Sequence, residues 1–160
     1  MHALPVGNSV QRAAYDRYRT DRLRARLRQF FMRLLLVQGD SKYRAITVQW
    51  LSVLAGVSAV QVASLGSEAM TLIGSMCPDV VLVDAVLPDM DGFEFTRKAK
   101  SNGGTCRVVV MIAAKSSRFE ESAHRAGADH AVEKSALHTM LPAVLAECAS
   151  PARGAIRKPS

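Results

Sequence analysis

The sequence predicts an α/β protein built around a parallel sheet of five strands. From Arg33 onward, short apolar runs alternate with amphipathic segments, which is the pattern of strands joined by crossover helices. The strand-sized runs are largely apolar throughout, as central parallel strands are when helices cover both faces. The 160 residues allow one domain with short extensions. No apolar run approaches the roughly 18 residues that a membrane-spanning helix needs.

The first strand is predicted at residues 33–37, where the apolar run is unbroken. Residues 38–40 form the turn after it, and a helix follows over about 41–55, because its apolar side chains recur at spacings of three and four. A short second strand is expected near 60–63. Together these residues predict the first two strands and the helix that connects them.

The second helix is expected over 67–76, with Ser67 as its N-terminal cap. Pro78 ends it, because the residue before a proline is driven away from helical geometry. The third strand is predicted at 80–83, and the helix after it at 93–100. A loop over residues 84–92 connects that strand to that helix.

The fourth strand is predicted at 107–112 and a helix at 116–126, which the glycine after it would close in a left-handed cap. The fifth strand is short, over 129–132. The last helix is expected over 136–148. Pro142 lies inside it, which predicts either a kink or a late start of the helix.

Five strands alternating with five helices predict a flavodoxin-like, doubly wound sheet with strand order 2-1-3-4-5. In such a sheet the site lies at the carboxyl ends of the strands, where the order reverses between the first and third strands. The residues at those two ends are Gln38, Gly39 and Asp40 on one strand and Asp84 on the other. The topology therefore predicts the place of the site.

Residues 84–92 read DAVLPDMDG and connect a predicted strand to a predicted helix. The segment resembles the Asp-x-x-(Met/Leu)-Pro-x-(Met/Leu)-Asp-Gly signature of receiver domains in bacterial two-component response regulators. Residues 66–69 resemble the Gly-x-Glu-Ala at the start of the family's second helix, and 126–129 its Ala-Gly-Ala before the fifth strand. Lys134 stands where the family has a lysine. The resemblance covers about residues 33–148.

The resemblance implies that Asp84 is the phosphoacceptor, which takes a phosphoryl group from a histidine kinase. Attack by a carboxylate on phosphorus requires neutralisation of the developing oxygen charge. In the family, Mg²⁺ and an acidic pair after the first strand serve this purpose, together with a lysine that here would be Lys134. A hydroxyl after the fourth strand and an aromatic residue on the fifth then relay the change.

This sequence departs from the family at four of those positions. Gln38 and Gly39 stand where the acidic pair is expected, and neither supplies a carboxylate. Asp40 lies one position after the expected acidic pair. We expect it to cap the helix that follows and to contribute at most weakly, as an acidic side chain, to the site. Ala113 replaces the hydroxyl, and Ala131 replaces the aromatic residue of the switch.

Loss of the acidic pair changes the electrostatics of the site. Two carboxylates about 4 Å apart repel by roughly 4 kcal/mol at an effective dielectric near 20, which an intact pocket offsets with its cation. Without the pair, little charge remains to attract Mg²⁺, so we expect no resident cofactor and Mg²⁺ only if Asp84 is phosphorylated. The sequence predicts a stand-alone, atypical receiver that acts as a protein-interaction module through the face at about 116–148.

Other functions remain open at this stage. One is a conventional phosphoacceptor at Asp84 in a phosphorelay. Homodimerisation is open too, and we expect no DNA-binding output module after residue 148. We expect no enzymatic activity, because no second catalytic group converges on Asp84 and the histidines are scattered, at His2, His124, His130 and His138.

Residues 1–32 form a basic extension with seven arginines against two aspartates. Its residues 12–31 could form a helix, which suggests nucleic-acid or membrane binding, a dimerisation arm, or simply a solvated segment. Met32 directly precedes the first strand, so translation could start at Met1 or at Met32. Residues 149–160 are expected to be a disordered tail. The three cysteines are isolated, which suggests a reducing, cytoplasmic location.

Overall fold

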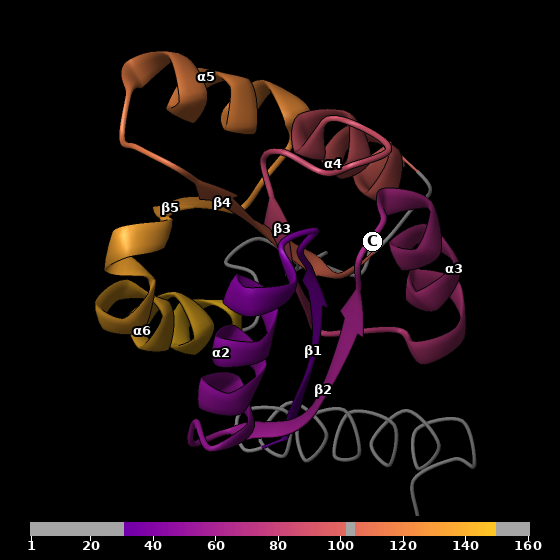
Figure 1. Ribbon diagram of the computed structural model, residues 1–160, viewed down its shortest axis with the longest axis vertical. Helices are drawn as coiled ribbons and strands as arrows, with labels where there is room; N and C mark the ends of the chain where they lie inside the picture. The colour runs from indigo at the N-terminus through magenta and orange to yellow at the C-terminus, as the bar shows by residue number, and fades with distance from the viewer. Residues whose placement is uncertain (1–30, 102–104, 150–160) are drawn as a thin grey trace, which may run out of the picture.

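A computed structural model describes residues 31–101 and 105–149 of the chain. It contains one parallel five-stranded sheet in the order β2-β1-β3-β4-β5, so the predicted fold class and strand order are confirmed (Figure 1). The strands are β1 (Met32–Val37), β2 (Val57–Ala63), β3 (Val80–Asp84), β4 (Arg107–Ile112) and β5 (His130–Glu133). The helices are α2 (Ser41–Ser52), α3 (Gly66–Met76), α4 (Gly92–Ser101), α5 (Ser117–Ala126), the 3-10 turn η1 (Lys134–Ala136) and α6 (Leu137–Ala149).

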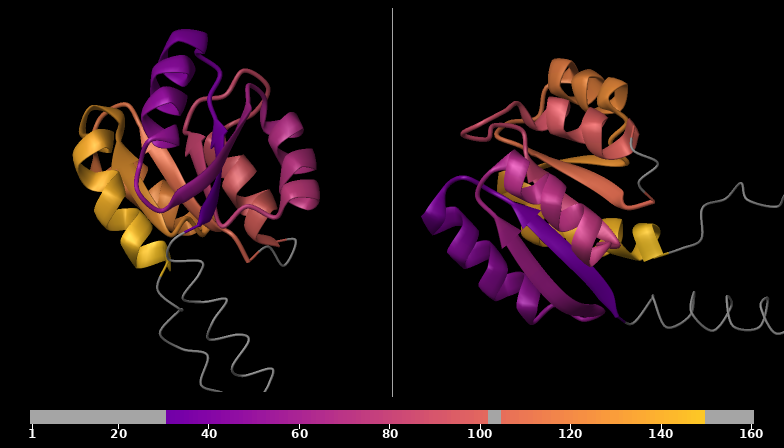
Figure 2. Two further views of the ribbon diagram at one scale, coloured as in Figure 1. Left: turned by 90° about the horizontal axis from the view of Figure 1, so that it is seen from below. Right: turned by 90° about the vertical axis from the view of Figure 1, so that its right-hand side faces the viewer.

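The helices divide between the two faces of the sheet. α2 and α6 cover one face, and α3, α4 and α5 cover the other (Figures 1 and 2). Neighbouring residues of the central strands point to opposite faces, so that Leu35 packs toward α3, α4 and α5 while Leu36 packs toward α2 and α6. The unbroken apolar runs of β1, β3 and β4 therefore supply two cores, as a sheet covered on both sides requires.

The register brings the carboxyl ends of β1 and β3 together. Val37 pairs with Val83, so that Gln38 and Asp84 each follow one member of the same strand pair. Asp84 is itself the last residue of β3 and pairs with Met111 of β4. The chain thus places these two side chains at one edge of the sheet before any side-chain interaction is considered.

Several element boundaries differ from the predicted ones. α2 ends at Ser52 rather than near residue 55, and β2 begins at Val57, where the amide of Met32 already donates to the Gly56 carbonyl at 2.7 Å. β5 is shifted by one residue. α6 begins before Pro142 and continues through it, so a late start is not what the structure shows.

The predicted cap of the second helix was wrong. Leu65, not Ser67, is the N-cap residue of α3, and its side chain makes no capping hydrogen bond. A carboxylate from elsewhere in the chain serves instead: Asp89 accepts from the amides of Gly66 at 2.8 Å and Ser67 at 3.0 Å. By contrast, the glycine after α5, Gly127, does adopt the expected left-handed cap, with φ of 85°.

Among the helices that the structure describes, none is long and apolar enough to cross a bilayer. The predicted basic extension, apart from its last two residues, and nearly all of the predicted tail lie outside the described residues.

Candidate functional site

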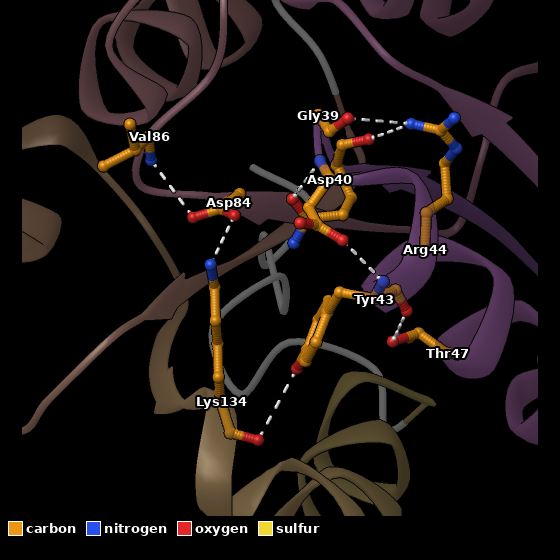
Figure 3. Close-up of polar contacts among 9 residues, drawn as sticks. Gly39, Asp40, Tyr43, Arg44, Thr47, Asp84, Val86 and Lys134 are labelled. Atoms are coloured by element: carbon orange, nitrogen blue, oxygen red, sulfur yellow. Dashed lines mark hydrogen bonds and ion pairs between the residues drawn. The ribbon is translucent and has the colours of Figure 1, made fainter.

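Asp84 and Lys134 meet at the carboxyl edge of the sheet. Asp84 ends β3 with only 5% of its side chain exposed, and Lys134 opens η1 directly after β5 with 28% exposed. The lysine Nζ lies 2.5 Å from Asp84 Oδ2, and the amide of Val86 donates to Oδ1 at 3.1 Å (Figure 3). Both carboxylate oxygens therefore have a donor from the protein itself.

Gln38 directly follows β1 and is buried, with a relative exposure of 1%. Its Oε1 accepts from the amide of Asp40 at 3.1 Å. Its Nε2 is the one buried side-chain nitrogen or oxygen in the described part of the chain that has no hydrogen-bond partner. An unsatisfied buried donor costs about 1–3 kcal/mol, so this amide is held at the site at the expense of stability.

Asp40 caps α2, as predicted. Its Oδ1 accepts from the amide of Tyr43 at 2.7 Å (Figure 3). Arg44, one residue further along α2, donates to the carbonyl oxygens of Gln38 at 2.6 Å and Gly39 at 3.2 Å. The carboxylate and the guanidinium both hold the turn between β1 and α2, which leaves Asp40 committed to the helix.

Gly39 faces the loop that follows β3. A Cβ atom at this position would lie 2.9 Å from both Cδ and Cγ of Pro88. Any larger residue would push the two loops apart, because carbon atoms do not approach this closely without displacement. The second position of the expected acidic pair is thus filled by close packing rather than by a charge.

The loop after β3 is held by its own motif residues. Asp91 Oδ1 accepts from the amide of Phe93 at 2.6 Å, which places it at the start of α4. A Cβ atom at Gly92 would lie 2.1 Å from the carbonyl oxygen of Asp84, so only glycine fits there. With Asp89 bound to the start of α3, three motif residues serve to fix the loop that carries Asp84.

Tyr43 is a member of the site that the sequence analysis missed. Lys134 Nζ lies 5.4 Å from the centroid of the Tyr43 ring, and the Tyr43 hydroxyl donates to the Lys134 carbonyl at 3.5 Å (Figure 3). Burial, with a further contribution from the charge of Asp84, raises the pKa of Tyr43. Its place in the first turn after residues 38–40 was the available signal, since that turn lies at the same edge of the sheet.

Comparison with known proteins shows the family to which the chain belongs. A model of the response regulator receiver domain matches residues 34–146. The chain belongs to this family. Receiver domains are the signalling modules of two-component systems, and they generally use Mg²⁺ for phosphorylation.

Two relatives and one solved structure illustrate the similarity. Protein-glutamate methylesterase/protein-glutamine glutaminase 5 of Myxococcus xanthus is 34% identical over 104 residues, which are 64% of this chain and 30% of that protein. Response regulator MprA of Mycolicibacterium vanbaalenii is 35% identical over 103 residues, which are 64% of this chain and 44% of that protein. A two-component response regulator of the LuxR family from Aurantimonas sp. is 27% identical with a TM-score of 0.66, covering 73% of this chain and 86% of that one. The chain spans less than half the length of these two curated relatives.

The side chains of this receiver do not fit a Mg²⁺ site. Magnesium takes oxygen ligands in near-octahedral geometry. Here the oxygens of Asp84 accept from Lys134 and Val86, and Asp40 accepts from Tyr43. The free group of Gln38 is an N–H donor, which cannot ligate a cation. Within residues 31–101 and 105–149, no three His, Cys, Asp or Glu side chains come together to hold a metal ion.

The two positions at which the sequence predicts a lost switch carry only methyl groups. Ala113 follows β4 and is exposed, and Ala131 lies in β5, half-buried against the core beneath α3, α4 and α5. Neither can donate a hydrogen bond or swing a ring. Neither of these two side chains can therefore relay a change at Asp84 by hydrogen bonding or by ring movement.

Proposed function

We propose that this receiver acts as a protein-interaction module of two-component signalling whose Mg²⁺-dependent phosphorylation at Asp84 is impaired. The observation that carries the proposal is the buried amide of Gln38, which has an unpartnered nitrogen where the family implies a carboxylate. A donor at this place neither attracts a cation nor replaces one.

The ion pair at the site supports the same conclusion. Asp84 and Lys134 compensate each other's charge, and the Val86 amide occupies the second carboxylate oxygen. Transfer of a phosphoryl group would add negative charge to a pocket whose nearby cation is already paired with Asp84. In the absence of well-placed metal ligands, we infer that phosphorylation is slow.

The partner surface in this proposal is the face formed by α5, β5 and α6, within residues 116–148. Phe119 on α5 and Met140 on α6 are among the exposed large apolar side chains, which are suited to a protein contact. A histidine kinase is the partner class that the family implies, and a second copy of this chain is the alternative. The proposed location is the cytoplasm.

The test is incubation of the purified protein with acetyl phosphate and Mg²⁺, followed by intact-mass measurement. The proposal expects little or no gain of one phosphoryl group under conditions that label a conventional receiver. Asp84→Asn is the control that shows whether any gain occurs at this residue. A rapid Mg²⁺-dependent gain that the Asn variant lacks would establish the competing function, a conventional phosphoacceptor.

A further inference from the structure

α2 and α6 lie on the same face of the sheet (Figure 1). Two aromatic residues of α2 contact the segment formed by η1 and α6. Tyr43 and Trp50 are seven residues apart, which places them two turns apart on the same side of the helix. Tyr43 contacts Lys134 as described above. Trp50 contacts His138 of α6, with ring centroids 4.5 Å apart and an angle of 52° between the rings.

Lys134 contacts Asp84 through its ammonium group, and it contacts Tyr43 through both its ammonium group and its main-chain oxygen. Its Nζ binds Asp84 Oδ2 and lies over the Tyr43 ring, while its main-chain oxygen accepts from the Tyr43 hydroxyl. Tyr43 is thus attached to the lysine at the charged end and at the backbone. A displacement of the ammonium group from Asp84 changes the contact with the ring that it lies above.

The backbone contact leads directly to α6. Lys134 begins η1, which runs into α6 at Leu137 without an intervening loop. His138 lies four residues beyond Lys134, and it is the residue that contacts Trp50. Two routes therefore link the Asp84–Lys134 ion pair to the Trp50–His138 contact. One runs through Tyr43 and α2, and the other runs along η1 into α6.

We propose that Tyr43 couples the Asp84–Lys134 ion pair to the contact between α2 and α6, so that a change in charge at Asp84 alters the packing of Trp50 against His138. Tyr43 acts here as a positioning residue, because it holds Lys134 and does not itself react. Ala113 and Ala131 carry only methyl groups and cannot relay a change at Asp84. The contacts of Tyr43 give the described side chains another route for such a relay. The proposal goes beyond the proposed function, because it needs only a change of charge at Asp84 and not its phosphorylation.

The chain offers a direct probe, because Trp50 is its single tryptophan. Asp84→Asn removes the charge that holds Lys134 while keeping the size of the side chain. We expect this substitution to shift the Trp50 emission maximum and to change its intensity in the otherwise unaltered protein. The same substitution made in a Tyr43→Leu protein should shift the emission much less.

Three further variants sharpen the test. Tyr43→Phe keeps the ring beneath Lys134 and should preserve most of the response. Tyr43→Met is an alternative to Tyr43→Leu if the latter fails to fold, as judged by its thermal melting. Asp79→Asn, at the opposite end of β3, is the matched control for loss of a carboxylate and should leave Trp50 emission unchanged.

Two results would overturn the coupling. One is an unchanged Trp50 emission on Asp84→Asn substitution in the full chain. The other is a response that persists undiminished in the Leu or Met variants of Tyr43. Neither experiment uses phosphorylation, so a failure here leaves the proposed function standing, and labelling by acetyl phosphate tests that function separately.

Discussion

At the scale of single residues, the pairing of Asp84 with Lys134 determines which substitutions the site tolerates without loss of stability. The carboxylate is almost fully buried, and Lys134 is its cationic partner. A buried charge that loses its partner is strongly destabilising, whereas exchange of both partners for neutral groups is much less costly. Neither partner can therefore be replaced alone without destabilising the fold, whether or not the pair serves phosphorylation.

We predict that Lys134→Met lowers the free energy of unfolding by about 3 kcal/mol, because it leaves the Asp84 carboxylate unpaired. Adding Asp84→Asn to this variant should recover a large part of the loss. Urea denaturation of the single and double variants measures both effects. Lys98→Met is the matched control, since Lys98 pairs with Glu94 at the surface and its loss should cost about 0.5 kcal/mol or less. Equal costs for the two lysines would contradict the prediction.

Gln38 and Gly39 show how far single residues could be predicted. Their identity predicts that the acidic pair is missing, but it does not explain why these residues stand there. The clash of a Cβ atom at Gly39 with Pro88 depends on how two distant loops meet, and the lone Nε2 of Gln38 depends on which neighbour takes its Oε1. Tyr43 was missed for the same reason, since its contact with Lys134 joins residues 91 positions apart.

At the scale of elements, α3 and the loop after β3 are joined by Asp89. Its carboxylate binds the first two amides of α3, and a Cβ atom at Gly66 would lie 2.6 Å from Met90 Sδ. The hydrogen bonds from the Ser67 and Gly66 amides lower the pKa of Asp89. The start of α3 thus depends on the ionised form of a side chain that lies in the loop carrying Asp84.

The pH dependence of this contact follows from the direction of that shift. Because the pKa of Asp89 is lower in the folded state than in the unfolded state, its contribution to stability is present above the unfolded pKa, about 4, and is lost as the pH falls through the folded value. Asp89→Asn should therefore be less stable than the natural protein at pH 7, and the difference should shrink at acid pH. Thermal melting from pH 7 to pH 3 measures this, with Glu121→Gln on the exposed side of α5 as the control. A difference that stays constant with pH would contradict it.

The elements themselves were predicted well because their signals are local. Short apolar runs alternating with amphipathic segments predicted the five strands, and the glycine after α5 predicted its end. The start of α3 was predicted wrongly because its cap comes from Asp89, 23 residues away from Gly66. Boundaries that depend on such tertiary partners are invisible to a reading of neighbouring residues.

At the scale of the whole molecule, charge is unevenly distributed along the chain. Seven arginines fall within residues 1–32, which lie almost entirely outside the described structure, and the net charge of the chain is +7. Nucleic-acid or membrane contact through residues 12–31 therefore stays a prediction from the sequence. It belongs to a segment separate from the candidate site.

We predict that any binding of DNA or anionic liposomes by this protein weakens with rising salt and disappears when residues 1–31 are deleted. Co-sedimentation with liposomes and electrophoretic mobility shift of DNA, each at two salt concentrations, measure this. Circular dichroism of the shortened chain is the control for folding. Binding that survives the deletion would place the contact within the remaining residues 32–160 and contradict the prediction.

We propose that the amide of Gln38 limits phosphorylation of Asp84. The most direct measurement compares the rate at which acetyl phosphate and Mg²⁺ label the natural protein, Gln38→Asp and Gln49→Asp, by intact mass. Gln49 lies on the exposed side of α2, so its variant carries the same chemical change away from the site. We predict that Gln38→Asp is labelled at least about tenfold faster, equivalent to about 1.4 kcal/mol, while Gln49→Asp is unchanged. Rapid labelling of the natural protein, with no gain from Gln38→Asp, would contradict the claim.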